Sequence, residues 1–245
     1  PFAENEIKIV TQGKLVSKPY LNITIDLMKQ FGVEVINRDF KEFIIAPGQE
    51  FHGKDLTIEG DFSSAAFFFA AAAITGGRVK VTGLNPESAQ GDKVFVDFLE
   101  QMGCQVNKGK DWIEVVGKPL TGIKVDMGDF PDIVTPLAVV AAFAKGKSEF
   151  FNIAHLKFKE CNRLEAPVKE LQKMGIDAKC TEDRIIVQGG KPRGAVIETN
   201  GDHRMVMSFA IAGLKVPGIK IKNPENVNKS FPEFFEVLEE VINGN

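Results

Sequence analysis

The 245-residue chain has few cysteines, no long apolar run and no basic block. Its cysteines, Cys104, Cys161 and Cys180, form no C-x-x-C pair, which argues against a zinc knuckle or disulfide framework and fits a reducing cytoplasm. The longest apolar run, 65–74, is about half as long as a membrane span requires. The formal net charge is −3 and no basic block is present, which argues against a nucleic-acid surface.

Sequence signatures of the common covalent and metal-dependent mechanisms are missing as well. The chain has no GxxxxGK[ST], GxSxG, HExxH or GxGxxG motif. Its 44% hydrophobic and 26% charged residues are ordinary for a globular protein of one or two domains with a sizeable core.

The strongest pattern in the sequence is an internal repeat. Three amphipathic segments end at Gly32, Gly103 and Gly175, which are 71 and 72 residues apart. A Gly-Asp pair followed by an aromatic or histidine residue opens units at 60–62, 128–130 and 201–203. A glycine that follows an amphipathic helix suits a left-handed helix end, so we expect the three helices to stop there.

The repeat predicts an α/β (α+β) protein built from β-α-β-α-β-β units of about 70 residues. The first helix of each unit is apolar on all sides, so these helices should be buried with the sheets around them. We expect a domain boundary at 59/60, with repeats at 60–127, 128–200 and 201–245, the last without its closing strands. The alternative is two unrelated α/β domains with glycines at coincidental positions. Because the chain starts at Pro1 within an incomplete unit, we expect a fragment or a processed product.

Charged and polar side chains gather in the loops that precede the predicted helices. Basic residues are unfavourable at a helix N-terminus, where the dipole is positive, unless an anion is bound there. The sequence therefore predicts a site for phosphate or carboxylate groups. Each residue also has a simpler interpretation: a solvated helix face for Lys159 and Arg163, a helix cap for Ser17 and Asp132, and a surface position for Lys229.

Four stretches together resemble the 5-enolpyruvylshikimate-3-phosphate (EPSP) synthase family. They are Ser17-Lys18-Pro19-Tyr20, Gly60-Asp61-x-Ser63-Ser64-Ala65, Lys159-Glu160-x-Asn162-Arg163 and Asp202-His203-Arg204-Met205. The resemblance implies a two-domain inside-out α/β barrel with ligands between the domains. It also implies transfer of the enolpyruvyl group of phosphoenolpyruvate to the 5-hydroxyl of shikimate 3-phosphate, with release of phosphate and without a metal or organic cofactor.

The resemblance also implies a role for individual residues. The catalytic carboxylates would be Asp132 and Glu160. The contacts of shikimate 3-phosphate would be Ser17, Tyr20, Asp132, His155 and Lys159. The contacts of phosphoenolpyruvate would be Arg163, Arg204, His203 and Lys229.

Further expectations follow from the same resemblance. Residues 1–59 would be the rear of the N-terminal, shikimate-phosphate domain and 60–245 most of the C-terminal one, so the chain alone should be inactive. The intact enzyme would be a cytoplasmic monomer that glyphosate inhibits in competition with phosphoenolpyruvate. Two other functions stay open: a UDP-N-acetylglucosamine enolpyruvyl transferase, and a non-catalytic α/β repeat scaffold.

Overall fold

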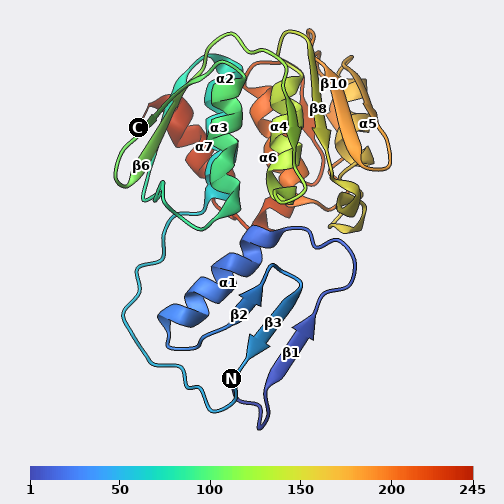
Figure 1. Ribbon diagram of the computed structural model, residues 1–245. Coiled ribbons are helices and arrows are strands. Elements are labelled where there is room, and N and C mark those ends of the chain that lie inside the picture. Colours follow the sequence, from blue (N-terminus) through green and yellow to red (C-terminus); the bar gives the residue numbers. More distant parts are fainter. Residues whose placement is uncertain (245) are drawn as a thin grey trace. The chain divides into compact units, whose positions relative to one another are not determined.

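The computed structural model describes residues 1–244 as two compact units (Figure 1). The first contains Pro1–Glu59 with the short segment Ala89–Gly91, and the second contains Gly60–Ser88 with the chain from Asp92 onward. None of the helices within residues 1–244 combines the length and the apolar character needed to cross a membrane.

The first unit is a three-stranded sheet with one helix. Its elements are β1 (Ile7–Val10), α1 (Lys18–Gln30), β2 (Ile36–Arg38) and β3 (Glu42–Ile45). The strands form an antiparallel sheet in the order β1-β3-β2. None of the residues of α1 is buried, and the buried apolar residues of this unit are Val33, Phe43 and Ile44.

The second unit repeats one series of elements. The first repeat contains α2 (Phe62–Thr75), β4 (Arg78–Thr82), η1 (Gly91–Lys93), α3 (Val94–Gln101), β5 (Gln105–Lys108) and β6 (Trp112–Val116). The second contains β7 (Lys124–Asp126), η2 (Pro131–Ile133), α4 (Val134–Ala141), β8 (Lys147–Phe151), η3 (Ala154–Phe158), α5 (Glu165–Lys173), β9 (Asp177–Cys180) and β10 (Arg184–Gln188). The third contains β11 (Val196–Ile197), α6 (His203–Gly213), β12 (Lys220–Ile221), η4 (Pro224–Lys229) and α7 (Phe234–Asn243).

The antiparallel strands pair in the same way in the first two repeats. The strand order is β4-β6-β5 in the first and β7-β8-β10-β9 in the second. The strand that precedes a buried helix runs parallel to the strand that follows it, as β7 does with β8 and β11 with β12. These pairs are β-α-β crossovers. The predicted element order is confirmed in the second repeat, where the 3₁₀ turns η2 and η3 precede α4 and α5, whereas the first repeat starts at α2.

The buried helices form the centre of the second unit, as predicted. α2, α4 and α6 contact one another, and Figure 1 shows them side by side with β6 and β10 outside them. Every residue of α4 is buried, and alternate residues of β6 and β10 face the same core. The amphipathic α3 and α5 each bury one side and leave charged residues exposed on the other.

Glycines end the amphipathic helices and the last strand of each complete repeat. Gly32, Gly103 and Gly175 have positive φ angles, as predicted. Gly117 follows β6 and Gly189 follows β10, and a Cβ on either would overlap a carbonyl oxygen near the C-terminal end of α2 or α4. The glycines therefore allow each sheet to approach its buried helix closely.

We expect the Gly189→Ala substitution to destabilise the second unit by about 1–3 kcal/mol, because the new methyl group meets fixed backbone. The matched control is Gly190→Ala, whose Cβ would lie 3.5 Å from the Ile176 side chain, an ordinary contact. Urea unfolding followed by the fluorescence of Trp112 in β6 measures both variants. Equal unfolding midpoints for the two variants would contradict this account of the strand ends.

Candidate functional site

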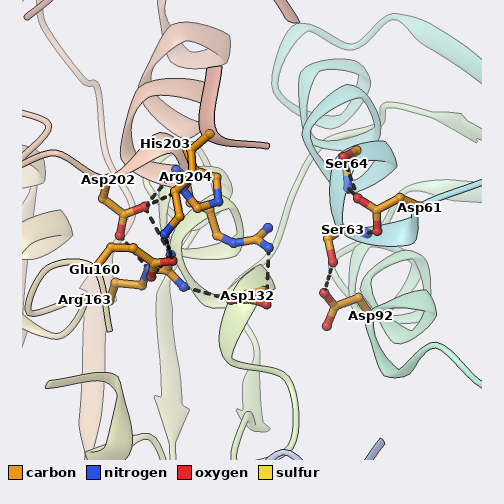
Figure 2. A network of polar contacts seen from close by, with 11 residues as sticks. Asp61, Ser63, Ser64, Asp92, Asp132, Glu160, Arg163, Asp202, His203 and Arg204 are labelled. Carbon is orange, nitrogen blue, oxygen red and sulfur yellow. Dashed lines mark hydrogen bonds and ion pairs between the residues drawn. The ribbon is translucent and has the colours of Figure 1, made fainter. Parts of the chain in front are cut away.

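One arginine and three carboxylates lie together in the second unit (Figure 2). Only 1% of the Arg163 side chain is exposed. Its guanidinium donates from Nε to Asp202 Oδ2 at 2.7 Å, from Nη1 to Asp132 Oδ1 at 2.8 Å, and from Nη2 to Glu160 Oε2 at 2.7 Å. We call these four residues the Arg163 cluster.

The members of the Arg163 cluster come from three segments that are far apart in the sequence. Asp132 lies in η2 before α4, and Asp202 is the N-cap of α6. Glu160 and Arg163 lie on the loop between η3 and α5. The cluster therefore ties together the loops that open the second and third repeats and the loop within the second.

Asp202 serves both the helix and the arginine. Its Oδ1 accepts a hydrogen bond from the backbone N–H of Arg204 at 2.9 Å, while both carboxylate oxygens accept from Arg163. The residue is fully buried, and a buried carboxylate needs this pairing together with the positive end of the helix dipole. The Gly-Asp opening of the third repeat thus has a structural as well as a site role.

Two further cations bind the outer oxygens of the cluster. Arg204 Nη2 lies 3.2 Å from Asp132 Oδ2, and Lys229 Nζ donates to Glu160 Oε1 at 2.5 Å. Charges therefore alternate along the series Lys229, Glu160, Arg163, Asp132 and Arg204. The Lys229 side chain is 54% exposed, and the buried Nε of Arg204 has no hydrogen-bond partner among the described residues, so both end cations can accept another anion.

The cluster controls the ionisation of Glu160. Partial burial acts to raise the pKa of this carboxyl, but the hydrogen bond from Lys229 and the charges of Arg163 and Lys229 outweigh it and lower the pKa to about 2. Burial likewise opposes the charge on Arg163, yet the hydrogen bond and charge of Asp202 raise its pKa overall. Glu160 is therefore an anion at neutral pH in this arrangement.

His203 and Cys161 lie beside the cluster with suppressed charges. Burial and the neighbouring Arg204 lower the pKa of His203, so its imidazole is neutral at pH 7. Burial and the Asp202 carboxylate raise the pKa of Cys161 to about 12, so its thiol is a poor nucleophile. Among residues 1–244, no group of three or more His, Cys, Asp or Glu residues is arranged to hold a metal ion.

The structure brings together Asp132, Glu160, Arg163, Arg204 and Lys229 from the set that the sequence predicts. His155 lies in η3, and Lys159 follows it on the loop that carries Glu160. Ser17 and Tyr20 belong to the first unit, at the N-cap and in the first turn of α1.

The simpler interpretations of Arg163 and Asp132 are wrong. Arg163 does not lie on a solvated helix face, because it is buried and precedes α5. Asp132 does not act as a helix cap, since Phe130 is the N-cap of η2 and no side-chain cap bond is present there.

Sequence reasoning missed two acidic residues. Asp202 belongs to the Asp202-His203-Arg204-Met205 stretch that carries the family resemblance, but neither the sequence pattern nor the resemblance gives it a role in the site. Asp92, in η1, is buried and accepts a hydrogen bond from Ser63 Oγ. No motif marks Asp92, because its partners lie in other segments of the chain.

Solved structures and curated proteins resemble the chain over nearly its whole length. It is 44% identical over 245 residues to the 3-phosphoshikimate 1-carboxyvinyltransferase of Nostoc punctiforme. The alignment covers 98% of this chain and 58% of the relative. EPSP synthase from Acinetobacter baumannii matches with a TM-score of 0.81 and 29% identity, over 97% of this chain and 57% of that one. The enolpyruvyl transferase NikO from Streptomyces tendae, at 19% identity and a TM-score of 0.72 over 96% of this chain and 55% of its own, shares the fold.

These matches establish the α/β fold of enolpyruvyl transferases, and the chain spans somewhat more than half the length of the relatives it matches. The family profile described as EPSP synthase (3-phosphoshikimate 1-carboxyvinyltransferase) matches residues 1–238. The chain therefore belongs to the EPSP synthase family.

Proposed function

We propose that the chain supplies one part of an enzyme that transfers the enolpyruvyl group of phosphoenolpyruvate to the 5-hydroxyl of shikimate 3-phosphate. The observation that carries this proposal is the alternating series of charges, in which Asp132 and Glu160 lie on either side of Arg163 with Arg204 and Lys229 at the ends. The names of the relatives agree with this reaction.

The two end cations fit the two anionic groups of phosphoenolpyruvate. Arg204 can form the paired hydrogen bonds that suit a carboxylate, and Lys229 is a compact charge that suits a phosphate. Each now binds a carboxylate of the chain, so ligand binding exchanges one anionic partner for another. Glyphosate also carries a carboxylate and a phosphonate, and we propose that it competes for the same cations.

Arg163 contributes differently from the two end cations. Four of its hydrogen bonds already go to carboxylates of the chain, and its side chain is almost fully buried. We propose that it holds Asp132 and Glu160 in position, and its contact with phosphoenolpyruvate stays a prediction.

Asp132 and Glu160 supply the acid and base groups that addition and elimination require. In the addition, the 5-hydroxyl oxygen bonds to C2 of phosphoenolpyruvate, the hydroxyl loses its proton, and the methylene carbon gains one. In the elimination, the methyl group loses a proton and the C2–O bond to phosphate breaks. Two carboxylates on opposite sides of one cation can serve these transfers.

Ligand binding prepares Glu160 for this work. The bond from Lys229 helps to hold the pKa of Glu160 near 2, so the residue carries no proton at neutral pH. A phosphate that takes Lys229 away removes this influence, and the pKa of Glu160 rises toward the range of a useful acid.

The function can be tested with a chimera. The part of the Nostoc punctiforme relative that the chain does not match is joined to this chain, and phosphate release is assayed with both substrates. We expect release that requires both substrates, and none from the 245-residue chain alone. A chimera that unfolds cooperatively like the Nostoc protein but releases no phosphate would contradict the proposal.

We also propose that the intact enzyme is a cytoplasmic monomer.

Arg204→Gln in the chimera should raise the KM for phosphoenolpyruvate about 30- to 1000-fold, because a charged hydrogen-bond partner of the ligand is lost. The KM for shikimate 3-phosphate should change much less. The matched control is Arg184→Gln, which removes an arginine of β10 that pairs with Asp183 and with Glu149 of β8. Similar small effects of both variants on both substrates would show that Arg204 does not bind phosphoenolpyruvate.

Glu160→Gln in the chimera should lower turnover by about 10²- to 10⁴-fold, since the amide cannot carry the proton. Binding of phosphoenolpyruvate should not weaken, because Lys229 is released from its ion pair. The control is Glu165→Gln, which removes an exposed carboxylate paired with Lys169. Turnover of Glu160→Gln at the level of this control would exclude Glu160 from the proton transfers.

A further inference from the structure

Asp92 is a buried carboxylate that the proposed reaction does not use. It lies in η1 and is 4% exposed. One oxygen accepts a hydrogen bond from Ser63 Oγ in the first turn of α2 at 2.5 Å, and Oδ1 has no hydrogen-bond partner among the described residues. Buried carboxylate oxygens are normally paired, so an unpaired one favours a proton on the group.

Charged residues from three other segments act on Asp92. Burial is the largest influence and raises its pKa, against the hydrogen bond from Ser63. Asp132 in η2 and Asp61 at the N-cap of α2 raise the pKa further, and Arg204 in α6 lowers it, with a resulting pKa of about 6. Figure 2 shows Asp92 and Ser63 together, with Asp132 and Arg204 in the same view.

Lys93, the neighbour of Asp92 in η1, forms its hydrogen bond with a different residue. Its ammonium group donates to the carbonyl oxygen of Pro86 at 3.3 Å. Arg204 is therefore the cation that most strongly favours the charged form of Asp92.

We propose that Asp92 is a proton acceptor linked to anion binding at Arg204. When an anion binds to Arg204, the Asp92 carboxylate takes up a proton from water. This inference rests on the proposed function only in taking Arg204 as a ligand of the anion. A bound anion offsets the charge of Arg204 and adds negative charge near Asp92, and both effects favour the protonated carboxyl. Protonation also neutralises Asp92, which removes its repulsion with the anion, and it makes Oδ1 a hydrogen-bond donor.

The sign of the pH dependence follows from this linkage. The bound state holds more protons than the free state, so affinity for the anion falls as pH rises through the titration range of Asp92. If binding raises the titration midpoint by about one pH unit, affinity should fall about fivefold between pH 6 and pH 8.

The test uses the 245-residue chain and sulfate, an anion whose charge is constant over this pH range. Carbon NMR follows the chemical shift of the Asp92 side-chain carboxyl carbon as a function of pH, without and with saturating sulfate. The signal is assigned through the backbone resonances of the same residue. We expect a midpoint near pH 6 in the free chain, in line with the environment of the residue, and a midpoint about one unit higher with sulfate. An unchanged midpoint, or no binding of sulfate at pH 6, would overturn the proposal.

Two variants identify the proton acceptor by calorimetry. Asp92→Asn keeps the acceptor for Ser63 and should bind sulfate with equal affinity at pH 6 and pH 8. His203→Gln is the control, because His203 is buried next to Arg204 and also titrates. It should keep the fivefold dependence of the unmodified chain. Loss of the dependence in His203→Gln, with retention in Asp92→Asn, would assign the proton to the histidine instead. None of these measurements involves enolpyruvyl transfer, so they can fail while the proposed reaction holds.

Discussion

The site depends on the pairing of one buried arginine with three carboxylates. Arg163 has almost no contact with water, and it stays charged because Asp202, Asp132 and Glu160 surround its guanidinium. The positive charge of Arg163 in turn offsets the cost of removing each carboxylate from water. Removing the arginine would leave three negative charges close together, so the positions of three loops depend on a single side chain.

The repeated fold brings those loops to one place. Asp132 and Asp202 lie at the starts of α4 and α6, and Asp61 caps α2, where its carboxylate accepts from the backbone N–H groups of Ser63 and Ser64. The three helices contact one another in the centre of the second unit, and acidic residues at their N-termini suit the positive ends of their dipoles. Asp132, at the start of α4, pairs with Arg204, and Glu160, on the loop before α5, pairs with Lys229.

The repeated elements could be predicted from the sequence because their signals are local. Glycines such as Gly103 and Gly175 end helices through their own backbone angles, and the all-apolar segment at α4 indicates burial by itself. The partners of Arg163 could not be predicted, since they lie 31 and 39 residues away as well as three. The contact of Arg163 with phosphoenolpyruvate that the family resemblance implies stays a prediction, and the resemblance gave no indication of its four hydrogen bonds to carboxylates of the chain. Asp92 had no signal at all, because its burial arises only when η1 packs beside α2.

The most direct test of the central claim is the free energy of unfolding of Arg163→Met, measured with urea and Trp112 fluorescence. Three carboxylates would lose their shared partner, so we predict a loss of about 3–5 kcal/mol at pH 7. Adding Asp202→Asn to this variant should recover part of the loss, because one unpaired buried charge is removed. An Arg163→Met variant as stable as the unmodified chain would contradict the claim that this arginine holds the site together.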